Sequence, residues 1–259
     1  MVTVLVGIVM FAALIGMIIC SKKQKTNPNA QPIAIALLVV VIGCGGFVMY
    51  KMDVFGSGGV STIMENENRF ACSKATVLGQ YLAKEYPGQK ALIICDQGFK
   101  KNDRTQKIIA ALGEGLGGPD KVVADTVSVK ASKEMQGPDG ELVMPLEEVM
   151  TAKDYDAAVA KHSDCPIIVS MIGLPRDWGR LKVLKDKKKH LALLNANIFE
   201  QKLAIKKGMI AAAISFKPGV KFTEDPAPTD PKKAFELRYL LITPKNIDKI
   251  RKENPKLFQ

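Results

Sequence analysis

Polar side chains follow four apolar segments of the chain, at the points where buried strands are expected to end. Seven of them are candidates for contact with a ligand: Asp96, Gln97, Arg176, Asp177, Asn195, Asn197 and Lys217. The carboxyl ends of parallel strands share one edge of a sheet, where loops diverge and helix N-termini point inward. Carboxylate, amide, guanidinium and ammonium groups gathered at such an edge can hold a polar small molecule. The sequence therefore predicts a ligand-binding edge, without a recognisable set of catalytic residues.

Two of these residues have a structural alternative. Asn197 precedes a helical segment that begins at Ile198, and Asp177 precedes one expected to begin at Trp178. A side-chain oxygen at this position accepts a hydrogen bond from the free N–H groups of a helix N-terminus. Helix capping and ligand contact are therefore both open for Asn197 and Asp177.

Asp96 and the pair Lys217-Pro218 resemble the acidic residue and the Lys-Pro pair of receiver domains. A receiver also needs an aspartate at the end of its third strand, and residues 170–173 are Ser-Met-Ile-Gly. Phosphotransfer has no acceptor here. An enzyme that uses Asp96, Asn195 and Lys217 in another reaction remains an alternative.

A glycine-rich stretch at 113–118 has the spacing GxGxxG. This motif binds a pyrophosphate where it follows a strand and opens a helix. Here it ends a helical segment and precedes a strand, so a helix C-cap and a turn are expected. The loop after Asp96 also lacks a phosphate-binding pattern. We expect no nucleotide and no other cofactor.

The two histidines, His162 and His190, flank expected strands in lysine-rich or polar surroundings. No HxH, HExxH or CxxC spacing occurs in the chain, so no metal site is expected. Both histidines are interpreted as surface or strand-entry residues. The nearest approach to a nucleophile elbow, Gly56-Ser57-Gly58, lies in a linker rather than after a strand.

The elements that must position these residues are short apolar segments alternating with helical ones. The expected strands lie at 90–96, 121–129, 165–175, 190–197, 209–219 and 235–243. Near-continuous apolar runs separated by helices are typical of a parallel sheet buried on both faces. The sequence predicts a doubly wound α/β domain with a mostly parallel sheet of five or six strands. Its layout is similar to a flavodoxin-like domain or one lobe of a type 1 periplasmic binding protein, which implies a fold and not a function.

Helices are expected between the strands. The first has Ala71, Ala75, Leu78 and Leu82 on one face, and the full set is expected at 65–86, 104–116, 152–161, 178–188, 198–208 and from Pro244 onward. Segment 130–150 is polar and rich in Gly and Pro, which indicates an exposed hairpin or lid, or a simple turn. Segment 217–233 is expected to be a long loop.

Cysteine placement argues against disulfides. Cys95 comes at the outgoing end of the first expected strand and Cys165 at the incoming end of the third. In parallel neighbours these sulfur atoms lie too far apart to bond. Free thiols argue mildly against an oxidising compartment.

The N-terminal part of the chain differs from the rest in charge. The chain has 37 Lys and Arg, 26 Asp and Glu and a net charge of +11, but its first 50 residues contain three lysines and no acidic residue. Residues 1–20 and 32–50 are uncharged and apolar, and about 20 helical residues cross a bilayer core. These features predict a transmembrane hairpin at 1–52, a linker at 53–64 and a soluble α/β domain at 65–259. Gly43, Gly45 and Gly46 could let the two helices approach closely, or could simply reflect how common glycine is in membrane helices.

Lysines predict the orientation of this hairpin. Its connector contains Lys22, Lys23 and Lys25, whereas Lys51 and Arg69 follow the second apolar run. The positive-inside rule therefore places the connector in the cytoplasm and the α/β domain on the outer face of a bacterial-type inner membrane. Nothing basic precedes the first run, so it is not expected to be a cleaved signal peptide.

A basic stretch at 176–207 contains ten Lys or Arg against Asp177, Asp186 and Glu200. It could dock on anionic lipid headgroups, or it could be a solvated helix face. Nucleic acid is not an expected partner, because aromatic residues are scarce in this stretch. Trp178 and Phe199 lie far apart in the sequence, and no aromatic residue is interleaved with the run of lysines between them.

The anchor, the layout of the α/β domain and the missing catalytic motifs together predict a class of function. We expect a membrane-anchored, non-enzymatic module whose partners are the lipid bilayer and either a small-molecule ligand or a protein of the cell envelope. A structural docking subunit of an envelope assembly is the main alternative, and an enzyme that uses strand-end residues is another.

Overall fold

The structure is a computed structural model that describes residues 2–23, 30–51, 57–129, 144–220, 222 and 225–259. The chain forms two compact units, Met1–Met64 and Glu65–Gln259.

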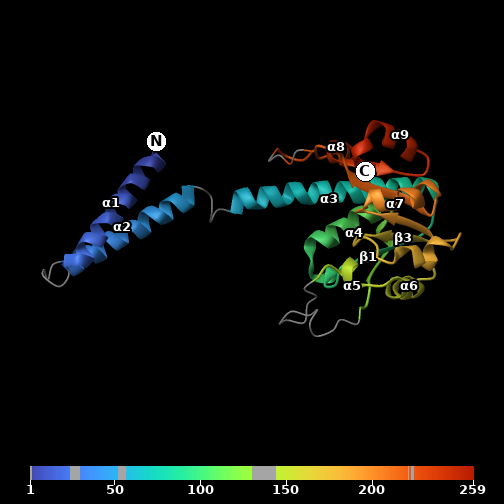
Figure 1. The fold of residues 1–259 in the computed structure, drawn as a ribbon, viewed down its shortest axis with the longest axis horizontal. Coiled ribbons are helices and arrows are strands. Elements are labelled where there is room, and N and C mark those ends of the chain that lie inside the picture. The colour runs from blue at the N-terminus through green and yellow to red at the C-terminus, as the bar shows by residue number, and fades with distance from the viewer. Residues whose placement is uncertain (1, 24–29, 52–56, 130–143, 221, 223–224) are drawn as a thin grey trace. The chain divides into compact units, whose positions relative to one another are not determined.

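The first unit contains two long helices, α1 (Val2–Lys23) and α2 (Ala30–Lys51), which pack side by side in opposite directions (Figure 1). Gly16 provides close packing between them, because a Cβ atom there would lie 2.9 Å from Cδ1 of Leu37. Gly43, Gly45 and Gly46 have no described atom within 4 Å of their Cβ positions, so the described residues give no sign of a close approach at these three glycines. Among the described residues, no helix has the length and apolar character needed to span a membrane.

The second unit is built on one six-stranded sheet in the order β2-β1-β3-β4-β5-β6. The strands are β1 (Ala91–Cys95), β2 (Val122–Thr126), β3 (Ile167–Ser170), β4 (His190–Leu193), β5 (Ile210–Phe216) and β6 (Tyr239–Ile242). The first five are parallel and β6 pairs antiparallel with β5. The prediction of a mostly parallel sheet of five or six strands in an α/β domain is confirmed.

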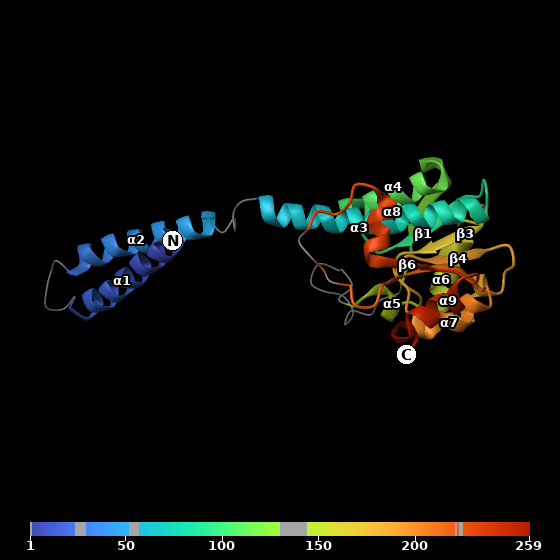
Figure 2. The same cartoon turned by 90° about the horizontal axis from the view of Figure 1, so that it is seen from above.

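Helices cover both faces of this sheet (Figure 2). One face packs against α3 (Ser57–Glu85), α4 (Asp103–Leu116) and α8 (Pro231–Arg238), and the other against α5 (Leu146–Val149), α6 (Ala152–Ala160), α7 (Ile198–Lys206) and α9 (Ile247–Glu253). Side chains alternate between the two cores, so that Ile93 joins the first and Leu92 and Ile94 join the second. Burial on both faces explains why the strands are almost entirely apolar.

Two glycines bring α3 and α4 together. A Cβ atom at Gly79 would lie 2.7 Å from the carbonyl oxygen of Leu112, and one at Gly115 would collide with the carbonyl oxygen of Thr76. The backbones of the two helices therefore touch. The predicted C-cap is also present, because Gly117 has φ of 98° and its N–H closes the last turn of α4.

One helical prediction is wrong. Residues 178–188 form two short 3-10 turns, Trp178–Arg180 and Lys182–Leu184, rather than a helix. The carboxylate of Asp156 on α6 accepts a hydrogen bond from the backbone N–H of Lys182 at 3.0 Å, which holds this segment in a turn.

The last strand starts later than expected. Residues 235–238 belong to α8, because the Asp230 side chain caps the helix and Pro231 occupies its first position. The expected loop at 217–233 therefore ends at Asp230.

One further boundary differs from the expectation, and one predicted segment lies partly outside the described residues. Helix α3 starts at Ser57, inside the stretch 53–64 that composition assigns to a linker. In segment 130–150, α5 and the residues around it are described, whereas 130–143 lie outside the described residues.

Cysteines and histidines lie where the strand pattern predicts. Strand β1 pairs with β3 in parallel, so Cys95 and Cys165 lie at opposite ends, and all five cysteines are free. His190 begins β4 and stacks on Tyr86 with 3.8 Å between ring centroids. His162 lies 2.8 Å from a carboxylate oxygen of Asp125.

Candidate functional site

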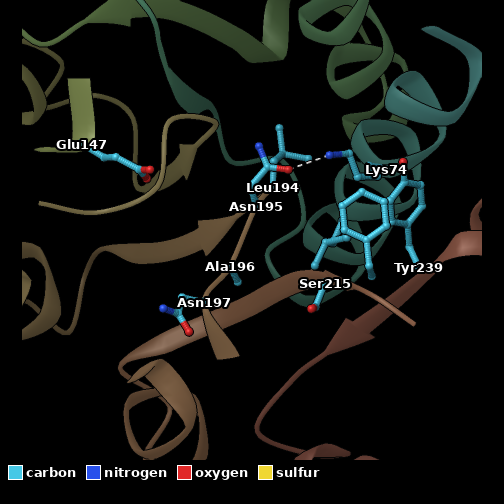
Figure 3. A pocket seen from close by; sticks show the side chains of 10 residues that line it. Lys74, Glu147, Leu194, Asn195, Ala196, Asn197, Ser215 and Tyr239 are labelled. Atoms are coloured by element: carbon cyan, nitrogen blue, oxygen red, sulfur yellow. Dashed lines mark hydrogen bonds between the residues drawn. The ribbon is translucent and has the colours of Figure 1, made fainter. Parts of the chain in front are cut away.

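A cavity of about 290 Å³ opens at the carboxyl ends of β4 and β5 (Figure 3). Its lining residues come from α3, the α5 region and the ends of three strands: Lys74, Glu147, Leu194, Asn195, Ala196, Asn197, Ile214, Ser215, Phe216 and Tyr239. A second hollow of about 270 Å³ shares Glu147, Asn195 and Asn197 and extends to the loop after β3. This is the sheet edge at which a parallel α/β domain is expected to bind ligands.

Lys74 of α3 provides the cation of the cavity. Its Nζ donates a hydrogen bond to Oδ1 of Asn195 at 2.6 Å, as Figure 3 shows, and Nδ2 of Asn195 donates to the carbonyl oxygen of Met171 at 3.0 Å. Burial, and to a smaller extent the charge of Arg104, lower the pKa of Lys74 to about 8. In the described part of the chain, no carboxylate lies within ion-pair distance of Lys74.

Glu147 provides a carboxylate on the opposite side of the cavity (Figure 3). Its Oε2 lies so close to Gly173 that a Cβ atom on this residue would collide with it. Gly173 also has a φ of 80°, which favours glycine. Burial raises the pKa of Glu147, and the nearby charges of Glu148 and Asp96 raise it further. The residues of this corner therefore form an acidic cluster of Asp96, Glu147 and Glu148.

Aromatic side chains form the wall beside Lys74. The Tyr239 ring lies 5.3 Å from Nζ of Lys74 and 5.0 Å from the Phe216 ring. The neighbouring Arg238 is only 4% exposed, stacks on Phe70 at 3.4 Å and pairs with Glu67 at 2.6 Å. These contacts fix the start of β6 against α3, and they therefore hold Tyr239 and Lys74 in place relative to each other.

Four of the seven sequence candidates line one of the two cavities or belong to the acidic cluster. Asn195 and Asn197 line both cavities, and the Asn197 side chain makes no capping bond to α7. Arg176 lines the second hollow and lies 3.4 Å from Glu148, with its side chain 77% exposed. Asp96 follows β1 and belongs to the acidic cluster; burial raises its pKa.

The other three candidates do not line either cavity. Gln97 is exposed after β1. Asp177 accepts a hydrogen bond from the backbone N–H of Ala152 at 2.8 Å, so it satisfies the first N–H of α6, whose N-cap is Thr151, and makes no capping bond to the turn that follows it. Lys217 donates through its ammonium to the carbonyl oxygen of Glu236, near the end of α8.

Sequence patterns missed Lys74, Glu147 and Tyr239. For Lys74 a signal existed, because it lies beside Ala75 and is spaced three and four residues from the buried Ala71 and Leu78 on the helix. A lysine next to an apolar stripe indicates a charge held close to the core. Glu147 and Tyr239 gave no such signal, because their positions depend on how α5 and β6 pack.

Metal binding has no visible basis in the part of the chain that the structure describes. It contains no group of three or more His, Cys, Asp or Glu side chains arranged to hold an ion.

Comparisons with known proteins provide little beyond the arrangement of elements. No protein-family model and no curated protein sequence matches the chain. Similar solved structures include the sugar-binding protein of a sugar ABC transporter from Bacillus halodurans, with 10% identity and a TM-score of 0.44 over 69% of this chain and 64% of that one. Another is GanP, a glucose-galactose binding protein from Geobacillus stearothermophilus, with 12% identity and a TM-score of 0.37 over 73% and 55% of the two chains.

A third similar structure is described as a LacI transcriptional regulator from Bacteroides fragilis, with 9% identity and a TM-score of 0.42 over 69% of this chain and 61% of that one. The present chain thus spans less than two thirds of the length of each of these proteins. Likeness at this level does not extend to ligand or function.

Proposed function

We propose that this chain is a membrane-anchored, non-enzymatic α/β module that binds a small polar molecule in the cavity at the ends of β4 and β5. The observation that carries the proposal is the convergence of Lys74, Asn195 and Glu147 on one cavity from separate elements. Leu194 and Ile214 provide an apolar floor. Ligand sites of proteins combine an apolar lining with a few converging polar groups, and 290 Å³ is near the lower end of their size range.

We propose binding rather than catalysis because the three candidate catalytic residues, Asp96, Asn195 and Lys217, do not lie together in one cavity. Asn195 lines the cavity, Lys217 contacts the backbone of α8, and Asp96 lies in the acidic cluster. A nucleophile paired with a base within hydrogen-bond reach is the usual sign of covalent catalysis. The cavity lining contains no His, and the recorded hydrogen bond of Lys74, the amine that could serve as a base, goes to Asn195 and not to Ser215.

The binding proposal is tested with the full-length protein purified in detergent. Thermal unfolding is followed in the presence of neutral sugars, organic acids and amino acids, and a ligand should raise the melting temperature in proportion to its occupancy. The variant Asn195→Ala should abolish the rise, whereas Asn254→Ala, at the end of α9, should keep it. If none of these compounds stabilises the wild type, the cavity is not a site for small molecules of these classes.

The anchor is supported by the sequence. The two uncharged apolar runs have the length of a bilayer crossing, and three lysines lie between them. Alkaline phosphatase fused after Gln259 should be active, and a reporter that needs the cytoplasm should be inactive there. The opposite pattern would overturn the outer-face orientation, and release of the protein by alkaline carbonate would overturn the anchor.

A second candidate function is a docking subunit of an envelope assembly. Phe199 and Leu203 lie one turn apart on α7 and are 52% and 64% exposed. Exposed apolar side chains on one helix face favour contact with another protein. Phe199→Ser with Leu203→Ser should then lower the apparent mass of gently solubilised complexes, while a solitary wild-type monomer would contradict this function.

A further inference from the structure

The cavity has opposite charges on its two sides. Lys74 and Asn195 lie on one side, and Glu147 lies on the other (Figure 3). Neither charge has an ion-pair partner among the described residues. Lys74 is half-buried, whereas Glu147 is exposed at the rim. A cation that is partly removed from water without a partner costs free energy, so a ligand that neutralises Lys74 binds favourably.

The Lys74 side suits an anionic group. Its ammonium has two donors left after the bond to Asn195, and Arg104 lies close enough to act on the same charge. The amide of Asn197 and the hydroxyl of Ser215 line the same cavity and can donate hydrogen bonds to an oxygen. A carboxylate placed here would replace the missing counterion.

The Glu147 side suits a cationic group. Glu147 and Glu148 line the second hollow together, the charge of Asp96 also acts on Glu147, and the nearby Arg176 pairs with Glu148 and is largely in solvent. Because Gly173 has no side chain, the Glu147 carboxylate can lie against the loop after β3 at the rim of both cavities. An ammonium group placed between Glu147 and the cavity floor would balance this negative charge.

Size and lining restrict the molecule that carries both groups. A cavity of about 290 Å³ has room for roughly ten non-hydrogen atoms, at about 30 Å³ each. Leu194, Ile214 and Phe216 offer an apolar surface for a hydrocarbon group that the molecule carries beside its two charged groups. A neutral sugar would leave both Lys74 and Glu147 unpaired, and a simple anion would leave Glu147 unpaired.

We propose that the ligand is a zwitterion of the α-amino acid class, with its carboxylate bound by Lys74 and Asn195 and its ammonium bound by Glu147. This inference rests on the proposed function of the cavity. It assigns Lys74 and Glu147 as the residues that distinguish amino acids from sugars and from simple acids.

The test uses full-length protein in detergent and isothermal titration. Each common L-amino acid is screened first, and the tightest binder is then compared with its N-acetyl derivative, its methyl ester and glucose. The N-acetyl derivative lacks the cation and the ester lacks the anion, so each should bind at least about tenfold more weakly than the free amino acid.

Variants assign each end of the ligand to its residue. Lys74→Met should weaken the free amino acid and the N-acetyl derivative by about tenfold or more but leave the ester unchanged, because the ester has no carboxylate to lose. Glu147→Gln should weaken the free amino acid and the ester but leave the N-acetyl derivative unchanged. Lys84→Met, an exposed position on α3, and Glu236→Gln, an exposed position on α8, are the matched controls and should change nothing.

The outcomes separate this inference from the proposed function. Binding of glucose that is unaffected by Lys74→Met would overturn the zwitterion while leaving a ligand-binding cavity. Binding of an amino acid whose ester and N-acetyl derivative bind equally well would also overturn it. Failure of every compound to bind would contradict both proposals.

Discussion

The ammonium of Lys74 donates a 2.6 Å hydrogen bond to the amide oxygen of Asn195, across 121 positions of sequence. This bond joins the middle of α3 to the loop after β4. Because an amide oxygen carries no net charge, it orients the ammonium without neutralising it. The unliganded protein therefore holds a partly buried cation without a counterion among the described residues, which costs stability and favours an anionic ligand.

Replacement of this lysine should stabilise the unliganded protein. Lys74 has a pKa of about 8 in the folded protein and about 10.4 in an unfolded chain, so the unfolded state binds more protons between these values. The cost is complete below pH 8 and disappears as the pH rises toward 10.4. Lys74→Met should therefore raise the free energy of unfolding at pH 7 by about 1 kcal/mol, after allowance for solvent screening.

Urea unfolding followed by the fluorescence of Trp178, the single tryptophan, measures this effect. The difference between wild type and Lys74→Met should shrink between pH 7 and pH 10, which separates Lys74 from the thiols and phenols that titrate in the same range. Lys84→Met should match the wild type throughout. A constant difference across this pH range would show that Lys74 is not the group responsible.

Gly173→Ala should weaken ligand binding through Glu147. Gly173 has φ of 80°, which an alanine tolerates poorly, and its Cβ atom would displace the carboxylate of Glu147. Gly208 is a matched control, because its φ is 73° but no described atom lies within 4 Å of its Cβ position. Both variants should lose about 1 kcal/mol of stability, and only Gly173→Ala should lower the affinity in isothermal titration. Equal affinities for the two variants would exclude Glu147 from the site.

Asp177→Ala should affect stability and not binding. The Asp177 carboxylate accepts a hydrogen bond from the first N–H of α6, beside the N-cap Thr151, and loss of such a bond costs about 1 kcal/mol. Asp177 lines neither of the two cavities at the ends of β3, β4 and β5. Urea midpoints and titrations on the same variant distinguish the two roles, and a loss of affinity without a loss of stability would return Asp177 to the ligand site.

Local patterns predicted the elements of the sheet well because burial on both faces imposes a strong signal. Runs such as Ala91–Cys95 and Ile210–Phe216 are apolar at nearly every position. Predictions failed where tertiary contacts override local preference. Asp156 holds Lys182 in a turn inside a stretch that is rich in helix-forming residues, and Asp230 with Pro231 extends a helix into a segment with an apolar strand pattern.

The candidate site was predicted in part for a related reason. Asn195 and Asn197 directly follow a strand, so the parallel arrangement alone brings them to the binding edge. Lys74 and Glu147 reach the same cavity from helices, and their approach depends on how α3 and α5 pack against the sheet. Lys217 follows β5, but the antiparallel pairing of β6 brings α8 beside it and engages its ammonium.

Acid should destabilise the domain through His190. Burial lowers the pKa of this imidazole, which stacks on Tyr86. As the pH falls below 6.5 the unfolded chain takes up a proton before the folded one, so stability present at neutral pH is lost in mild acid. The free energy of unfolding should fall between pH 7 and pH 5, and His190→Phe, which keeps an aromatic stack, should lose less over the same range. Parallel pH profiles for the two proteins would contradict this assignment.

The contact between Gly79 and Gly115 should be required for both stability and binding, because it determines where α3 lies. A methyl group at Gly115 would collide with the backbone of Thr76, two residues from Lys74, and the helix could accommodate it only by moving away from α4. Overpacking of this kind costs about 1–3 kcal/mol. Gly115→Ala should lower the urea midpoint accordingly and weaken the ligand whose carboxylate Lys74 binds, whereas Glu114→Ala, an exposed neighbour on α4, should change stability by less than about 0.5 kcal/mol. If Gly115→Ala lowers stability but leaves the affinity unchanged, the cavity tolerates a shift of α3, and Lys74 reaches the ligand through the length of its own side chain.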